Sequence, residues 1–152
     1  FGGDARRLVV IGHSAGGQLA AMMLACAWPT AQAGLPRDVV KAALGISGLY
    51  DLQPLLHTPS LQEVLRLTPD QVAQASPARL PAPARGRLIG VVGGDESGEY
   101  LRQNRLIQQA WGRERVPVAS VLAGLNHFSV LDSLAQPGTR LHALTRQLLR
   151  AV

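Results

Sequence analysis

One short motif constrains the fold of this chain more than its composition does. Residues 12–16 read Gly-His-Ser-Ala-Gly, directly after the apolar run Leu8–Ile11 and at the start of a helix-forming stretch, Ser14–Trp28. A G-x-S-x-G sequence between a strand and a helix forms a turn so tight that its central side chain projects above the sheet. The motif therefore predicts a strand, a sharp turn and a helix, with Ser14 as the candidate nucleophile.

The residues around Ser14 have roles of their own in such a turn. Bulky side chains would collide there, which explains the glycines at Gly12 and Gly16. The peptide NH of Ala15 would point at an oxyanion that forms on a bound substrate. The alternative is a tight strand-to-helix turn in which Ser14 has no chemical role. The strand before the motif and the helix after it favour the catalytic interpretation.

Two further groups are needed for the same chemistry. A serine hydroxyl becomes a good nucleophile when a base takes its proton and a third group holds that base. With this motif the order along the chain is Ser, then the acid, then His. The predicted strand Arg87–Val92 precedes Asp95 and Glu96, and the predicted strand Val116–Leu122 precedes His127. Because functional groups gather at the carboxyl ends of parallel strands, we expect these side chains to meet Ser14 there.

Each of these candidates also has a plainer explanation. His127 could be a loop or capping residue, although its place after the last strand favours a base. Asp95 and Glu96 could simply stabilise the N-terminus of a helix that begins near Ser97, and one of the two is expected to do so. The other histidines are interpreted as structural or solvated, namely His13, His57 and His142.

The composition limits the classes of function. A chain of 152 residues suits one domain, and no apolar run approaches the 18 residues of a membrane helix. The net charge of +5 comes from scattered arginines, so neither a nucleic acid nor a membrane is an expected partner. The single Cys26 excludes a disulfide framework, which favours a reducing, cytoplasmic compartment. We expect a small ester or formamide substrate, no metal and no organic cofactor; a homodimer is compatible with the sequence.

The order of predicted elements indicates the architecture. Strands alternate with helices, which predicts a three-layer α/β/α domain with a parallel sheet. Residues 51–86 interrupt the alternation with prolines and two helical pieces, Leu61–Leu67 and Asp70–Ala75, and form either a lid or pocket wall or an inert excursion. The predicted strands are Leu8–Ile11, Val40–Ile46, Arg87–Val92 and Val116–Leu122, and the predicted longer helices are Ser14–Trp28, Gly98–Arg113 and Pro137–Arg150.

Four stretches of the chain resemble the arylformamidase (kynurenine formamidase) and small esterase group of the α/β-hydrolase fold. They are Gly-His-Ser-Ala-Gly-Gly at 12–17, Ile-Ser-Gly-Leu-Tyr-Asp-Leu at 46–52, the acid loop at 95–100, and Asn-His-Phe-Ser at 126–129. The first is shared by many esterases, whereas the second and fourth are more particular to this group. The resemblance implies that residues 1–152 form the C-terminal part of a single α/β-hydrolase domain, with about four strands of its sheet.

The resemblance also implies roles for individual residues. Family members show an acidic residue, then Ser or Thr, any residue, Glu and an aromatic residue, a pattern that falls on 96–100 and selects Glu96 as the triad acid. Asp95 remains the alternative, because aspartate is the commoner acid in triads. Tyr50 and Asp51 are candidate pocket residues, although Asp51 could cap a short helix instead. The implied substrate is N-formylkynurenine, which would give kynurenine and formate.

Part of the family's pattern is missing from these residues. The resemblance implies an upstream His-Gly-Gly loop with further oxyanion NH groups, and the first strands of the sheet. The strand Leu8–Ile11 would be central in that larger sheet and becomes an exposed apolar edge here. The loss of one oxyanion donor typically costs about 10²–10³ in rate. We therefore expect residues 1–152 alone to hydrolyse substrate poorly.

Three functions are consistent with these observations. The favoured one is an arylformamidase, and the second is a broad carboxylesterase that acts on short acyl esters. The third belongs to another class: an inactive fragment or interaction module that retains the triad residues without using them.

Overall fold

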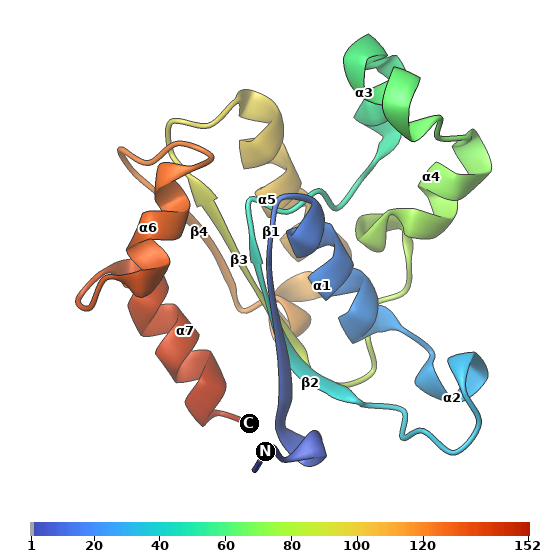
Figure 1. Ribbon diagram of the computed structural model, residues 1–152, viewed down its shortest axis with the longest axis vertical. Helices are drawn as coiled ribbons and strands as arrows, with labels where there is room; N and C mark the ends of the chain where they lie inside the picture. Colours follow the sequence, from blue (N-terminus) through green and yellow to red (C-terminus); the bar gives the residue numbers. More distant parts are fainter. Residues whose placement is uncertain (1) are drawn as a thin grey trace.

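A parallel four-stranded sheet with helices on both faces forms the body of the molecule (Figure 1). The computed structural model describes residues 2–152. The strands lie in the sheet in the order of the sequence, so every crossover moves one position in the same direction. This arrangement confirms the α/β class and the parallel sheet expected of a partial α/β-hydrolase fold. The strands are β1 (Leu8–His13), β2 (Val40–Ile46), β3 (Arg87–Gly93) and β4 (Val118–Leu122).

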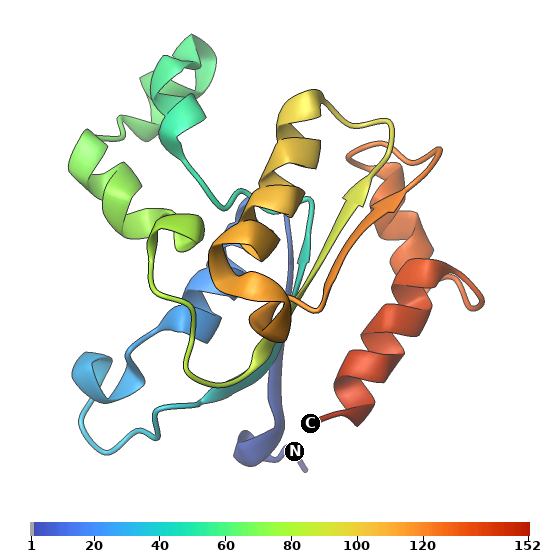
Figure 2. The same ribbon diagram turned by 180° about the vertical axis from the view of Figure 1, so that it is seen from behind.

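The longer helices divide between the two faces of the sheet. Helices α1 (Ala15–Ala25) and α5 (Gly98–Arg115) cover one face, and α6 (Ser129–Ala135) and α7 (Arg140–Arg150) cover the other, as Figures 1 and 2 show from opposite sides. The remaining elements are short: helices α2 (Trp28–Ala31), α3 (Pro59–Leu65) and α4 (Pro69–Ala75), and the 3-10 helices η1 (Ala5–Arg7), η2 (Gln53–His57) and η3 (Pro77–Arg79).

Side chains of the central strands alternate between two apolar clusters. Ala43 of β2 and Leu88 of β3 pack on the α1 and α5 side, together with Trp111. Leu44 of β2 packs on the opposite side, in the cluster that contains Leu144 of α7. Parallel strands that are covered on both faces have nearly continuous apolar sequences. For this reason the predicted bounds of β2 and β3 agree closely with the observed ones.

Strand β1 is an edge of the sheet along its whole length. It pairs with β2, and its side chains Leu8 and Ile11 are 39% and 40% exposed. This is the exposed apolar edge that the sequence analysis expected. The two ends of the chain lie beside each other below this strand, where Arg7 Nε donates to the carbonyl oxygen of Val152 at 2.7 Å (Figure 1).

The structure corrects the predicted helices after the motif and near the C-terminus. The helix after the motif ends at Ala25, because Cys26 is extended; the separate helix α2 begins at Trp28, with Pro29 in its first turn. The sequence analysis missed α6 entirely and began the last helix too early. Helix α6 begins after Asn126, whose Oδ1 accepts the NH groups of Phe128 and Ser129, both at 2.9 Å.

The crossover of residues 51–86 projects from the body as two short helices, α3 and α4 (Figures 1 and 2). Both begin one or two residues earlier than predicted, because Pro59 and Pro69 occupy the first helical position, where proline is favoured. Helix α3 leaves apolar side chains uncovered. Leu61, Val64 and Leu65 are 44%, 79% and 49% exposed.

Candidate active site

The motif at residues 12–16 forms a strained turn between β1 and α1. Ser14 has φ 56° and ψ −119°, in the left-handed region that residues other than glycine rarely adopt. Its peptide NH donates to the carbonyl oxygen of Ile46 at 2.8 Å, which ties the turn to the end of β2. Strain of this kind persists where the surrounding structure holds it, and it is concentrated at functional sites.

The glycines of the turn have different roles from those that the sequence predicted. A Cβ atom on Gly12 would lie 1.9 Å from the backbone oxygen of Gly16, so this position requires glycine. A Cβ atom on Gly16 would meet nothing within 4 Å, which corrects the expectation of a clash there. The second crowded position is Gly17, where a Cβ would lie 2.8 Å from the Cα of Gly48. The close approach is therefore between the turn, α1 and the loop after β2.

Ala15 is the first residue of α1. The first four NH groups of a helix have no intrahelical acceptor, and the positive end of the helix dipole is located there. The Ala15 NH thus remains available next to the Ser14 side chain, as an oxyanion donor must be.

The carboxylate of Glu96 is fully buried and holds three donors. Its Oε1 accepts the Ser47 hydroxyl at 2.5 Å and the NH of Gly93 at 2.8 Å, and its Oε2 lies 2.7 Å from Nδ1 of His127. Asp95 is exposed, and its peptide NH donates to the carbonyl of Leu125. The structure thus brings Glu96 to the imidazole and directs Asp95 to solvent.

The Glu96 contact fixes which nitrogen of His127 is free. Since Nδ1 donates to the carboxylate, Nε2 is the nitrogen that remains to accept a proton. The imidazole side chain is 23% exposed, so part of the ring is open to solvent.

His127 contacts the turn at residues 12–16 through His13, the residue that precedes Ser14. The rings of His13 and His127 lie with their centroids 4.4 Å apart, and His13 Nε2 lies 2.8 Å from the backbone oxygen of His127. Among the hydrogen bonds of residues 2–152, none joins Ser14 to His127. Catalytic hydrogen bonds are often long without substrate and tighten in the complex.

Two aromatic rings complete the surroundings of His127. The Tyr100 ring lies 4.5 Å from the imidazole, and the Phe128 ring lies 5.5 Å away with its edge toward it. Phe128 is 77% exposed, an unusual position for a large apolar side chain. The exposed surface beside the imidazole is therefore apolar and aromatic.

The two candidate pocket residues lie in other surroundings. Tyr50 is fully buried, its hydroxyl has no hydrogen-bond partner among residues 2–152, and burial raises its pKa. Asp51 pairs with Arg79 at 3.0 Å and Arg102 at 3.5 Å, and accepts the NH of Gln53 at the start of η2. Both residues thus anchor the beginning of the crossover, and neither presents a free polar group to solvent.

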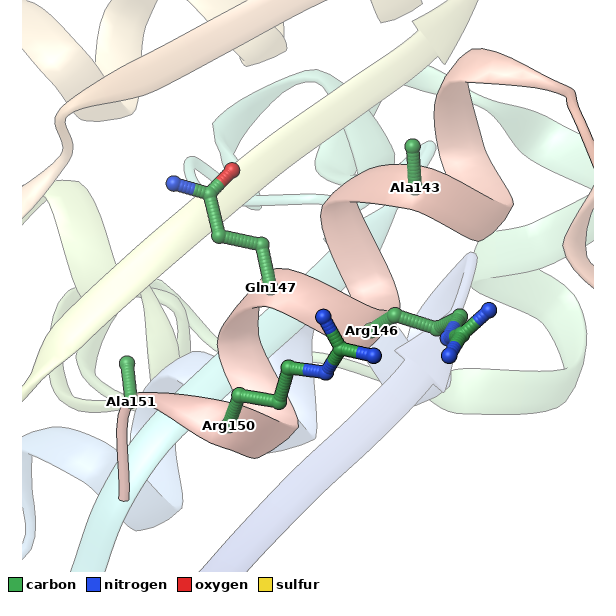
Figure 3. Close-up of a pocket in the computed structure, with 5 residues that line it drawn as sticks. All are labelled: Ala143, Arg146, Gln147, Arg150 and Ala151. Atoms are coloured by element: carbon green, nitrogen blue, oxygen red, sulfur yellow. The ribbon is translucent and has the colours of Figure 1, made fainter.

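Two hollows of the surface lie away from this cluster. A groove of about 510 Å³ runs along α7, where Arg146, Gln147 and Arg150 project from the helix (Figure 3). A cavity of about 530 Å³ lies near Cys26 and Val40, at the amino end of β2. Within residues 2–152, no cluster of His, Cys, Asp and Glu side chains is arranged to hold a metal ion. Within the same residues, no helix combines the length and apolar character that a membrane span requires.

Comparisons with known proteins agree with the fold. A proposed thioesterase from Silicibacter sp. TM1040 is 32% identical and superposes with a TM-score of 0.72 over 88% of this chain and 48% of its own. An esterase/lipase from an uncultured bacterium, 19% identical, superposes with a TM-score of 0.67 over 98% of this chain and 55% of its own. The chain is thus an α/β-hydrolase by fold.

Relatives found by sequence indicate which α/β-hydrolases the chain is similar to. Kynurenine formamidase of Danio rerio is 30% identical over 95% of this chain and 49% of its own length, and that of Salmo salar is 29% identical over 84% and 44%. Within the α/β-hydrolases, the chain is therefore similar to the kynurenine formamidase and small esterase group. It spans about half the length of the curated relatives it matches. No protein-family model matches the chain.

Sequence reasoning missed several residues of the cluster. Ser47 directly follows β2 and contacts the Glu96 carboxylate, with its backbone at φ 50°. Its position at the carboxyl end of a strand was a signal that could have found it. His13 was set aside as structural or solvated, and Tyr100 was given no role of its own; both rings lie against His127.

Proposed function

We propose that this chain carries the catalytic groups of a serine hydrolase that cleaves an aryl formamide. Ser14 is the nucleophile, His127 the general base, and Glu96 the group that holds the base. The observation that carries the proposal is the 2.7 Å contact between His127 Nδ1 and the buried Glu96 carboxylate, beside the strained turn at Ser14. The similarity to kynurenine formamidases supports the substrate class.

The proposed reaction proceeds by acyl transfer. Ser14 Oγ attacks the formamide carbonyl carbon while His127 Nε2 takes the hydroxyl proton, and the peptide NH of Ala15 stabilises the resulting oxyanion. The imidazolium of His127 then gives its proton to the leaving arylamine as the C–N bond breaks. Water attacks the formyl ester with His127 as base, which releases formate and restores Ser14. The Glu96 carboxylate stabilises the imidazolium in both steps.

The proposed substrate is N-formylkynurenine, with kynurenine and formate as products. Its arylamine side is apolar and flat, and Phe128 and Tyr100 offer aromatic surface beside the imidazole. Aromatic pairs in offset or edge contact contribute about 0.5–1.5 kcal/mol beyond the area that they bury. This surface supports an aryl leaving group.

A broad carboxylesterase is the alternative. The relative that is 32% identical is a proposed thioesterase, so a thioester or oxygen ester is also compatible with the same nucleophile and base. Turnover of N-formylkynurenine against that of a short nitrophenyl ester, measured with the full-length protein, separates the two substrate classes. We expect a higher kcat/KM for the formamide, and a preference for the ester would replace the first proposal with the second.

Covalent labelling tests the nucleophile directly. A fluorophosphonate probe is expected to modify the 152-residue chain at Ser14, and peptide mapping by mass spectrometry locates the adduct. The Ser14→Ala variant is the matched control and should take up no probe. If the complete protein takes up no probe at Ser14 either, the interaction-module hypothesis is favoured over both hydrolases.

A further inference from the structure

The base and the nucleophile come from opposite edges of the sheet. Ser14 follows β1 at one edge, and His127 lies in the loop after β4 at the other. The loop after β4 must therefore cross the carboxyl end of the whole sheet to bring the imidazole of His127 to the turn at Ser14. Something must hold its far end there, because a displacement of about 1 Å in a reacting group can cost 10²-fold in rate.

The loop is fastened by hydrogen bonds at both sides of this crossing. On the β3 side, the NH groups of Gly94 and Asp95 donate to the carbonyl oxygens of Leu122 and Leu125, at 2.7 and 3.0 Å. On the β1 side, His13 Nε2 lies 2.8 Å from the carbonyl oxygen of His127 itself. The second contact joins residues 114 positions apart in sequence and acts on the main chain of the base.

The contact with the His127 carbonyl oxygen defines which nitrogen of His13 carries the hydrogen. A carbonyl oxygen accepts, so Nε2 of His13 must carry the hydrogen. Burial lowers the pKa of His13 below its ordinary value of 6.5, and the nearby His127 acts in the same direction, against the opposite influence of the His127 carbonyl and the Glu96 carboxylate. The His13 ring is therefore neutral at pH 7 and places no second positive charge against the imidazole of His127.

We propose that His13 is a positioning residue: its Nε2–H fastens the backbone of His127 to the nucleophile turn, so that the imidazole is held beside Ser14. Its effect on rate rests on the proposed hydrolase function, whereas its effect on the placement of His127 does not. His13, the first x of the G-x-S-x-G motif, thereby connects β1 at one edge of the sheet with the loop after β4 at the other.

Two substitutions of similar length separate the hydrogen bond from packing. Glutamine carries its amide nitrogen at the same number of bonds from Cα as Nε2 of histidine, so His13→Gln keeps a donor. His13→Met matches that length and has no donor. The rate constant for fluorophosphonate labelling of Ser14 is measured in the 152-residue chain, after circular dichroism has shown that each variant is folded.

We expect the methionine variant to be labelled about 10- to 100-fold more slowly than wild type, and the glutamine variant to stay within about threefold. Equal losses in both variants would overturn the proposal, because packing rather than the hydrogen bond would then matter. Unchanged labelling in both would overturn it as well.

A spectroscopic measurement keeps this test independent of activity. Nitrogen-15 NMR of the imidazoles should show Nδ1 protonation of His127 in wild type and in His13→Gln, and a shifted or exchange-broadened signal in His13→Met. If the 152-residue chain is not labelled at Ser14 but the His127 signal changes as expected, the positioning role stands without support for the hydrolase proposal. If the His127 signal is the same in all three proteins, the positioning role fails.

Discussion

Two irregular segments lie outside the strands and helices that build the sheet, and they are held in opposite ways. The loop of residues 123–128 is short and fastened along its length, with the Leu125 and His127 carbonyls both bound and Asn126 folded over the start of α6. The crossover of residues 51–86 is long and is fastened at its two ends. Its middle, helix α3, exposes apolar side chains.

The ends of the crossover are joined to each other and to α5. The Ala78 NH donates to the Tyr50 carbonyl, and the Leu52 NH donates to the Ser76 hydroxyl, both at 2.8 Å. Gln103 of α5 accepts the NH groups of Tyr50 and Asp51. The comparison shows that this chain fixes the groups proposed for the chemical step and leaves the most exposed helix with few constraints. This is the usual division between rigid catalytic groups and adaptable surface segments.

The largest effect should come from the Glu96 carboxylate, which contacts His127 of the loop of residues 123–128. Glu96→Gln keeps the shape of the side chain and removes the charge that supports His127. We expect the labelling rate of Ser14 to fall about 10³–10⁴-fold, as is typical when the acid of a triad becomes an amide. The neighbouring Asp95→Asn, at an exposed site, should stay within about threefold. A large loss in the second variant and none in the first would assign the role to Asp95.

The next effect tests an anchor of the crossover. The buried indole of Trp111 in α5 donates to the carbonyl oxygen of Pro77 at 3.0 Å, where the crossover ends. Trp111→Phe loses this hydrogen bond and part of the packed ring, and should lower the free energy of unfolding by about 1–3 kcal/mol. Trp28→Phe is the matched control, because the half-buried Trp28 donates locally to Met23. If urea unfolding shows the same loss of unfolding free energy in both variants, the Trp111–Pro77 hydrogen bond does not contribute more to stability than the local one of Trp28.

A smaller effect concerns the pH dependence of stability that comes from His13, which contacts the loop of residues 123–128. Since burial lowers the pKa of His13 from 6.5, the unfolded chain binds more protons than the folded chain as the pH falls through this range. The resulting stability is present above pH 6.5 and is lost as the pH falls through the lowered pKa. Urea unfolding between pH 7.5 and 5 should show this decrease, and His13→Gln should reduce it.

An acidic group elsewhere provides a reference for that measurement. Arg102 lowers the pKa of Glu99 from 4.5 through their hydrogen bond, so the stability that depends on Glu99 is lost in a more acidic range. A pH profile of His13→Gln that matches wild type between pH 7.5 and 5 would remove His13 as the cause.

The smallest effect should come from the middle of the crossover. Val64 of α3 is 79% exposed, so Val64→Ser should change the free energy of unfolding by no more than about 0.5 kcal/mol. Thermal or urea unfolding provides the measurement, with Val72→Ser of the neighbouring α4 as a contrast because Val72 is fully buried. A strong destabilisation by Val64→Ser would mean that α3 is packed as tightly as the loop of residues 123–128.

Local patterns account for how much of the fold could be predicted. The strands β2 and β3 were located within one residue at each end, because strands buried on both faces leave continuous apolar runs. Helix α6 was missed because it has seven residues and begins through the side chain of Asn126 rather than through an apolar period. The crossover was anticipated from its prolines, which act on the local backbone.

The sequence alone determined the parallel α/β class, the sharp turn at Ser14 and the order in which the proposed nucleophile, acid and base follow one another, since these depend on local turns, apolar periodicity and motif spacing. The tertiary structure decided that Glu96 rather than Asp95 contacts His127, and that Ser47, His13 and Tyr100 surround the pair. The physical reason is that neighbours such as residues 95 and 96 have nearly the same local signal. Their side chains are distinguished when the loops after β2, β3 and β4 converge on one end of the sheet and one carboxylate is buried among donors.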